Sequence, residues 1–303
     1  SGQGLDDEVT VRAGRHEEKV HAAAAKRGGM SEVLTIPAAG LLPGTNRVAV
    51  VLGDGQRVEG TAVNWQLPAP ADATMEAVDL SKVLNANVAD IFRTDYLEPR
   101  SPYVSLAIPK QGIGGWAMNT YDPRIDDSGV RAHPEVNVDG VVFKTVATGN
   151  NIAFTSEWKN HPDHLTVPLS GKATHVYLLM AGSTSPMRSH MENGEVVVAY
   201  ETGAADRVAL VNPTNWWPIE QDYFIDDYQF DVPGPLPPRV DLQTGRVRIR
   251  TRAEALGKGG PVAGGSATVL DVAVDPARGL KSLPVRARAY EPIIGVMGVT
   301  VAR

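Results

Sequence analysis

Hydrophobic and polar residues alternate in short runs along the whole chain, and glycine or proline ends most of the runs. The first third contains four such runs, at residues 9–12, 32–36, 47–52 and 57–63. Their two-residue period and β-branched content are typical of strands, and Gly53-Asp54-Gly55 forms a hairpin turn signal between the last two. The segment 17–27 differs, because charged residues there precede an alanine run and two glycines, which indicates a short helix or an exposed loop.

The rest of the chain carries ten further runs, at residues 141–146, 152–155, 165–169, 175–180, 195–200, 207–211, 246–250, 268–274, 282–290 and 293–301. Asn193-Gly194 places a turn signal before one of them. Since no repeat recurs at a fixed period, a propeller or a solenoid is disfavoured. The pattern therefore predicts an all-β protein built as a two-sheet β-sandwich or jelly roll, preceded by a smaller β-sandwich segment.

Proline-rich stretches predict the domain organisation. A stiff stretch of proline and alanine at residues 67–73 reads as a linker between a small accessory β-sandwich segment at 1–66 and a larger domain at 74–303. Prolines and glycines in 99–115 predict a long loop inserted in the larger domain. The run 233–238 contains four prolines, which lack backbone donors, so it predicts a rigid crossing between sheets.

Composition excludes several function classes. The chain of 303 residues has no cysteine, which rules out disulfides, thiolate catalysis and cysteine-bound metals. Its formal net charge of −6 gives no general attraction to nucleic-acid phosphates. Its longest apolar stretches are much shorter than the about 20 residues that cross a bilayer. We therefore expect no nucleic-acid partner and no membrane span.

Six runs in the larger domain carry a resemblance to a known family, at residues 167–173, 178–184, 193–198, 212–223, 280–283 and 293–297. The fourth reads Asn-Pro-Thr-Asn-Trp-Trp-Pro-Ile-Glu-Gln-Asp-Tyr. Together they resemble the galactose-binding-like β-sandwich found as a poorly characterised C-terminal region of large secreted bacterial proteins associated with six-hairpin glycosidase-like modules. The resemblance covers roughly residues 74–303.

That resemblance implies a galactose-binding-like jelly roll and a carbohydrate context, with a glycan or polysaccharide as the partner. It also implies a bacterial protein that is secreted, periplasmic or at the cell surface. Proteins of this family are far longer, so the chain is expected to be a portion or subunit that works beside a larger catalytic chain or other copies of itself. The family provides no catalytic residue to carry over.

The stretch 212–230 concentrates aromatic, amide and carboxylate side chains, which is the mixture that sugar binding needs. Sugar C–H faces stack on indole rings and sugar hydroxyls need hydrogen-bonding partners, so Trp216, Trp217 and Asn215 are candidate ligand-binding residues. The structural alternative is that one tryptophan of the pair faces the core and the other faces solvent, as the alternation of a strand requires.

Four carboxylates in the same stretch have two alternative readings. Glu220, Asp222, Asp226 and Asp227 are the candidate acid and base of a glycosidase, which needs two opposed carboxyl groups about 5 to 9.5 Å apart. Asp222, Asp226 and Asp227 are also candidate ligands of a structural calcium ion, although no cofactor is expected to be required. Capping and loop hydrogen bonding are the ordinary roles of such residues.

Three residues outside that stretch are further candidates for ligand binding. Trp116 follows a run of glycines that would present its ring beside a groove, with burial as the alternative. Arg188 and His190 follow a turn signal at 183–186 and are candidates for hydrogen bonds to a sugar, with bracing of the loop as the alternative.

Familiar enzyme signatures are absent from the sequence. It has no phosphate-binding loop, no His-Glu-x-x-His and no Gly-x-Ser-x-Gly elbow. The leading hypothesis is an auxiliary or glycan-binding portion of a secreted glycoside hydrolase system. One alternative is that the chain is itself a glycosidase or polysaccharide lyase, and another is that it is a structural or assembly subunit.

Overall fold

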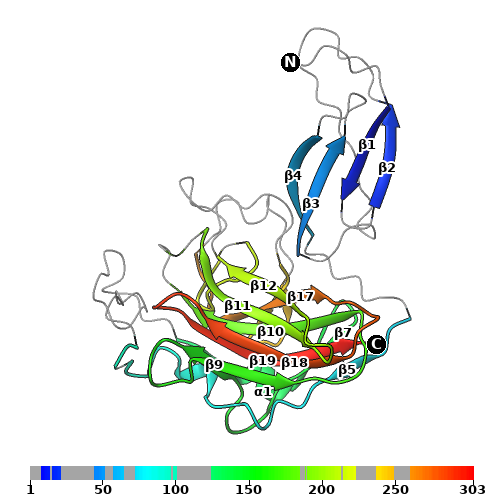
Figure 1. Ribbon diagram of the computed structural model, residues 1–303. Coiled ribbons are helices and arrows are strands. Elements are labelled where there is room, and N and C mark those ends of the chain that lie inside the picture. The colour runs from blue at the N-terminus through cyan, green and yellow to red at the C-terminus, as the bar shows by residue number, and fades with distance from the viewer. Residues whose placement is uncertain are drawn as a thin grey trace. The chain divides into compact units, whose positions relative to one another are not determined.

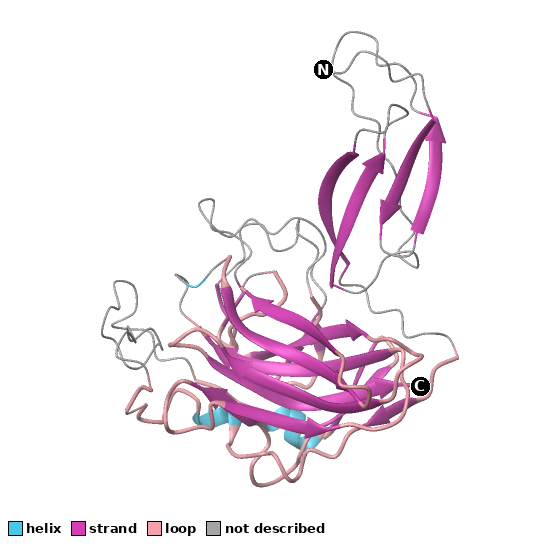
Figure 2. Cartoon of the chain, in the orientation of Figure 1, coloured by secondary structure: helices cyan, strands magenta, loops and turns pink. Residues whose placement is uncertain are grey.

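Strands predominate in the computed structural model, which describes residues 8–13, 16–21, 44–51, 57–64, 72–96, 98–100, 124–184, 188, 190–212, 214–222, 237–248 and 260–303. Helical residues are few, and the described helices are η2 (Val88–Asp90) and α1 (Ser128–Ala132), drawn in cyan in Figure 2. None of the helices in these ranges is long and apolar enough to cross a membrane. The predicted all-β class is confirmed.

Two compact units make up the chain, and the first contains residues 1–66. Its four strands form one antiparallel sheet in the order β2-β1-β3-β4. The bounds are β1 (Glu8–Ala13), β2 (His16–His21), β3 (Gly44–Val51) and β4 (Arg57–Asn64).

The helix predicted at 17–27 is wrong where the structure describes it, because His16–His21 forms β2 and pairs with β1 along its whole length. β2 is an edge strand with Glu17 and Lys19 exposed, and charged residues are common on such edges. The strand therefore lacks the apolar alternation by which strands are predicted from sequence. Residues 22–27 and the strand predicted at 32–36 lie outside the described ranges.

The second unit is built around a seven-stranded antiparallel sheet. Six strands follow the order β15-β14-β17-β10-β19-β5, and β8 also pairs with β19. The bounds are β5 (Met75–Ala77), β8 (Ala153–Ser156), β10 (His175–Ser183), β14 (Arg239–Asp241), β15 (Val247–Arg248), β17 (Ser266–Ala273) and β19 (Ile293–Ala302). Both faces of β10 and β19 are buried, so this sheet is covered on both sides.

A four-stranded antiparallel sheet in the order β12-β11-β18-β9 covers one face, and Figure 1 shows it lying over β10 and β19. Its strands are β9 (His164–Pro168), β11 (Glu192–Tyr200), β12 (Ala205–Val211) and β18 (Leu280–Ala287). Residues of β9 and β18 alternate between buried and more exposed positions, as one covered face requires. This sheet therefore turns its other face to solvent.

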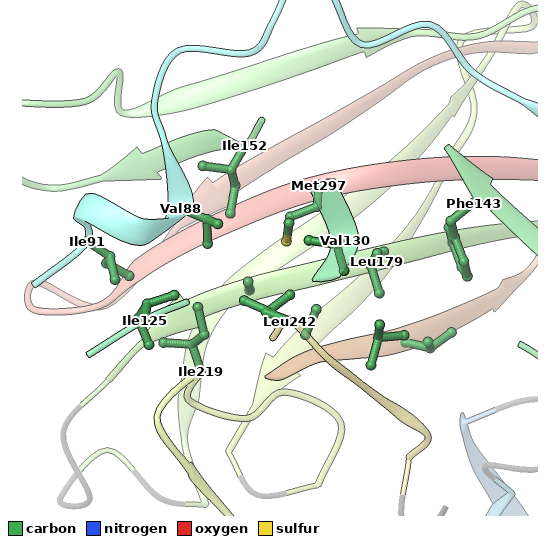
Figure 3. Packing of buried hydrophobic residues seen from close by; sticks show 14 of the residues in the cluster. Val88, Ile91, Ile125, Val130, Phe143, Ile152, Leu179, Ile219, Leu242 and Met297 are labelled. Carbon is green, nitrogen blue, oxygen red and sulfur yellow. The ribbon is translucent and has the colours of Figure 1, made fainter. Parts of the chain in front are cut away.

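The opposite face of the large sheet packs on an apolar cluster that includes η2, α1 and the hairpin of β6 (Glu135–Val138) and β7 (Val141–Lys144). Figure 3 shows Val88, Val130 and Phe143 converging on Leu179 and Met297. A two-stranded sheet of β13 (Gln221–Asp222) and β16 (Gly260–Pro261) lies outside this cluster. All ten strands predicted in the larger domain overlap observed strands.

The turn predicted at Asn193-Gly194 is wrong, because both residues lie within β11. The pairing of β11 with β12 shifts register between Glu192 and Gly194, which is the mark of a β-bulge. The Asn193 side chain receives a hydrogen bond from Thr184 Oγ1 (2.6 Å) and donates to the Arg188 carbonyl (2.9 Å). The asparagine therefore ties the segment before β11 to the strand itself.

Candidate functional site

Both candidate tryptophans are buried. Trp216 and Trp217 are each 1% exposed, and they lie between β12 and β13 in a segment without strand geometry. The expected alternation of one buried and one exposed ring therefore does not apply to this pair. Gly182 makes room for Trp216, because a Cβ atom built on this glycine would lie 3.0 Å from the indole ring. In this structure neither indole presents a face to a sugar.

Asn215 closes the turn that follows β12. Its Oδ1 atom accepts a hydrogen bond from the Val211 N–H (2.8 Å), and its Nδ2 atom donates to the Ala209 carbonyl (2.8 Å). An asparagine that bonds to nearby backbone in this way stabilises a local turn. Its amide groups therefore serve the loop that carries the tryptophans.

Asp222 forms a buried ion cluster with two arginines. Its carboxylate accepts hydrogen bonds from Arg239 Nη1 and from Arg248 Nη2, the second at 2.9 Å. The side chains of Asp222 and Arg239 are 2% and 4% exposed. Charges that are buried this deeply need charged partners, so the three residues form one interdependent group.

Arg239 uses most of its guanidinium on backbone carbonyls. Nη2 donates to Pro218 (2.7 Å) and Ser266 (2.8 Å), and Nη1 donates to Gln221 (3.0 Å). The same guanidinium lies 5.8 Å from the centre of the Trp217 ring, within cation–π range. Arg239 thus connects the 216–222 segment to β14 and β17, and this cluster reads as a structural clamp.

Glu220 lies beside the clamp, and burial shifts its pKa. Burial raises its pKa to about 7, because the charged form loses hydration, and the hydrogen bond from Ser183 Oγ (3.0 Å) and the charge of Arg239 offset only part of that effect. A carboxyl group that titrates near neutrality is suited to general acid–base chemistry. Glu220 is only 2% exposed.

Three of the predicted residues, Trp116, Asp226 and Asp227, lie outside the described ranges. Of the calcium ligands predicted at Asp222, Asp226 and Asp227, the structure therefore describes Asp222 alone. The Asp222 carboxylate already accepts hydrogen bonds from two guanidinium groups. Within the described part of the chain, no group of three or more His, Cys, Asp or Glu side chains is placed to hold a metal ion. Calcium binding stays a prediction.

Arg188 lies at the loop end of the four-stranded sheet, where β11 begins and β18 ends. Its Nε and Nη2 atoms donate to the two carboxylate oxygens of Glu291, both at 2.6 Å. The Glu291 side chain is 1% exposed and that of Arg188 is 26% exposed. This bidentate pair fixes a guanidinium whose third nitrogen, Nη1, lies 3.7 Å from Met191 Sδ.

His190 has a positive φ of 55°, and its N–H donates to the Asn212 carbonyl at 2.7 Å. Its backbone thus connects the segment before β11 to the start of the tryptophan segment. The Asn212 side chain is fully buried, and neither its Oδ1 nor its Nδ2 has a hydrogen-bonding partner among the described residues. Such a group costs about 1–3 kcal/mol unless water or a ligand satisfies it.

Met191 and Tyr290 are the exposed large hydrophobic residues of the described chain, at 43% and 39% exposure. The Arg288 and Ala289 N–H groups both donate to the Asn193 carbonyl, at 2.8 and 3.0 Å, so the turn that carries Tyr290 is tied to the start of β11. Arg188 bridges the same two segments. An exposed aromatic ring and a fixed arginine therefore belong to one end of the sheet.

Glu195 is the centre of an arginine cluster that the sequence reasoning missed. Its side chain is 2% exposed and accepts hydrogen bonds from Arg207 Nε and Arg286 Nε, and Arg288 Nε lies 3.5 Å away. Burial raises the pKa of Glu195, but the hydrogen bonds from the arginines outweigh it, so the pKa lies below its ordinary value. The alternation Arg286-x-Arg288-x-Tyr290 was the available signal.

A second missed group joins β10 to β17. His175 Nδ1 lies 2.9 Å from Asp271 Oδ1, and the His175 ring stacks on Tyr177 with 5.5 Å between centroids. Burial raises the pKa values of both Asp271 and Tyr177. Tyr177 stands directly opposite Asp271 on the neighbouring strand, and His175 reaches Asp271 on the diagonal, so the group links the two strands within the sheet.

Comparison with family models, with curated proteins and with solved structures found no match to this chain.

Proposed function

We propose that this chain binds glycan as an auxiliary β-sandwich portion of a secreted polysaccharide-degrading system. The observation that carries the proposal is the loop end of the four-stranded sheet, which combines an exposed aromatic ring with a fixed guanidinium. We define the Tyr290 surface as Arg188, Met191, Arg288 and Tyr290.

The chemistry of this surface suits a sugar. The apolar C–H face of a sugar ring stacks on an exposed aromatic ring, and Met191, whose sulfur lies 3.7 Å from Arg188 Nη1, adds an exposed apolar side chain. Hydroxyl oxygens accept hydrogen bonds from guanidinium N–H groups. Since Glu291 already holds Arg188 in place, little rotamer freedom is lost when a ligand binds. The sequence resemblance described above supports the same class of ligand.

Replacement of Tyr290 tests the proposal. Tyr290→Ala removes the ring and should weaken binding to a retained polysaccharide by roughly tenfold, or about 1.4 kcal/mol, whereas Tyr290→Phe keeps the stacking face and should bind within about threefold of wild type. Calorimetry against plant and microbial polysaccharides gives the affinities. Trp217→Phe is the buried control, and we expect it to leave the affinity unchanged.

Two results would refute glycan binding at this surface. The first is that no polysaccharide of the panel binds the folded protein. The second is that a polysaccharide binds and Tyr290→Ala retains the wild-type affinity, which would place the site elsewhere on the chain.

A second candidate function, hydrolysis or elimination of a glycosidic bond, is favoured by one observation. Glu220 has a pKa of about 7, as a general acid at neutral pH requires, and Asp222, two residues on, is held by two arginines. A glycosidase uses two carboxyl groups, one as general acid and one as nucleophile or base. Both groups are nearly excluded from solvent, which is why we rank binding first.

Glu220→Gln distinguishes the two candidates. If the chain is the enzyme, this variant should lose product release by more than about a hundredfold while it remains folded. If the chain is auxiliary, wild type and variant should release equally little product from a bound polysaccharide. Native mass spectrometry of the natural complex gives an independent reading, because an auxiliary portion should be recovered with a larger catalytic chain.

A further inference from the structure

Three long side chains project from alternate positions where β18 ends. Arg286, Arg288 and Tyr290 are exposed, whereas Ala287 and Ala289 between them are 3% and 7% exposed. Arg286 and Arg288 both approach the Glu195 carboxylate, so they lie on one face of the sheet, and Tyr290 follows them in the turn after β18. We call these three residues the Arg-Arg-Tyr track.

The Nε atoms of the two arginines of the track lie against the Glu195 carboxylate. Arg286 Nε bonds to Glu195, Arg288 Nε lies 3.5 Å from the same carboxylate, and the two side chains are 48% and 43% exposed. Among the described residues, neither Nη1 nor Nη2 of these arginines makes a hydrogen bond. Within the described part of the chain, the Nη donors of these two half-exposed guanidinium groups are therefore available to an oxyanion.

The neighbouring carboxylates are already occupied. Arg207 bonds to Glu195 through Nε and to Glu192 through Nη1 and Nη2, and the charge of Arg288 also acts on Glu192. Across the sheet, His164 stands opposite Arg286 and is bonded to Asp163 at 2.6 Å. Glu192 and Glu195 carry two negative charges against the three positive charges of Arg207, Arg286 and Arg288, so the group keeps a net charge of +1.

We propose that the Arg-Arg-Tyr track binds an acidic oligosaccharide, with sugar carboxylates on Arg286 and Arg288 and a sugar ring on Tyr290. The inference rests on the proposed function, glycan binding at the Tyr290 surface, and adds the class of ligand. A carboxylate accepts two parallel hydrogen bonds from the outer edge of a guanidinium. A neutral sugar would leave part of their positive charge uncompensated, because Glu195 supplies a single negative charge and also binds Arg207.

The test compares two hexasaccharides of the same sugar, one with free carboxyl groups and one with methyl-esterified carboxyl groups. The probes are a hexamer of galacturonic acid and the same hexamer with every carboxyl group methyl-esterified, titrated calorimetrically at low ionic strength, where surface charges are least screened. We expect wild type to bind the acidic hexamer at least about tenfold more tightly than the ester. Arg286→Gln with Arg288→Gln should remove that preference, so that the two hexamers bind with similar affinity.

A matched control removes the same charge elsewhere. Arg93 and Arg278 are exposed arginines that each pair with a single aspartate three residues away. The double variant Arg93→Gln with Arg278→Gln should keep the preference for the acidic hexamer. Arg288→Gln alone is the second variant, because it removes no hydrogen bond from Glu195 and should fold as wild type while losing several-fold affinity for the acidic probe.

The outcomes separate this inference from the proposed function. If both hexamers bind equally, Tyr290→Ala abolishes binding and the arginine variants do not change it, the acidic-ligand inference is wrong and glycan binding at the surface stands. If neither hexamer binds and the polysaccharide panel also fails, both are wrong. Equal losses in the track variant and the matched control would also overturn the inference, since net charge alone would then explain the effect.

Discussion

The clamp around Arg239 and the Arg-Arg-Tyr track contain the same chemical groups in opposite environments. In the clamp, Asp222 binds two arginines beside Trp217, and the carboxylate is 2% exposed. In the track, a buried Glu195 also binds arginines, but their outer edges and Tyr290 reach solvent. The first arrangement consumes its hydrogen-bonding capacity within the fold, and the second leaves part of it for a ligand.

This difference teaches that aromatic and charged residues indicate a binding site only when their burial is known. The stretch 212–222 is rich in the residues that bind sugars, yet its rings are buried and its charges are paired within the protein. The segment 286–290 is poorer in such residues and presents them to solvent. Substitutions in the two regions should therefore change different properties, stability in the first and affinity in the second.

The largest effect is expected for Asp222→Ala. The variant leaves Arg239, which is 4% exposed, as a buried charge without its carboxylate, so the free energy of unfolding should fall by about 3–5 kcal/mol. Glu192→Ala is the matched control, because it removes an exposed partner of Arg207 and should cost less than about 1 kcal/mol. Urea unfolding followed by tryptophan fluorescence measures both. Equal losses in the two variants would show that the buried ion cluster stabilises the fold no more than an exposed ion pair does.

A pH-dependent effect of intermediate size is expected at Glu220. Its pKa is raised from 4.5 to about 7 in the folded protein, so folding favours the protonated carboxyl group. The stability that it contributes is fully present below pH 4.5 and is lost as the pH rises to about 7, by about 3 kcal/mol. Glu220→Gln cannot ionise, and wild type should therefore lose that amount relative to the variant between about pH 4 and about pH 8. Parallel stability curves for the two proteins would contradict the raised pKa.

The strands were predictable from sequence because their period is a local property. In the larger domain, the alternation set by one covered face identified β9 and β18, and apolar runs identified β10 and β19. The edge strand β2 was missed, since an exposed edge needs no apolar period. The local pattern also gave a wrong prediction at Asn193-Gly194. This dipeptide is typical of turns, but here it lies in β11 at a β-bulge.

The candidate site was less predictable, because burial depends on residues distant in sequence. Trp216 is enclosed beside Gly182, and Arg239 reaches Asp222 and the carbonyl of Ser266 from another strand. No spacing within 212–230 encodes those contacts. Arg188 lies shortly before β11, and its partner Glu291 lies 103 residues away. The Arg-Arg-Tyr track could have been predicted from the sequence, because arginine and tyrosine alternate there with alanine.

The smallest effect on stability is expected for Tyr290→Ala, and it completes the comparison of the two regions. Tyr290 is 39% exposed in a turn after β18, so its loss should change the free energy of unfolding by no more than about 0.5 kcal/mol. Trp216→Ala removes a ring that is 1% exposed and should cost about 3–5 kcal/mol. Denaturant unfolding of both variants, with calorimetric binding on the same samples, then separates the two properties. A large stability loss in Tyr290→Ala would show that the ring packs within the fold, and any loss of binding in that variant would no longer identify a contact with sugar.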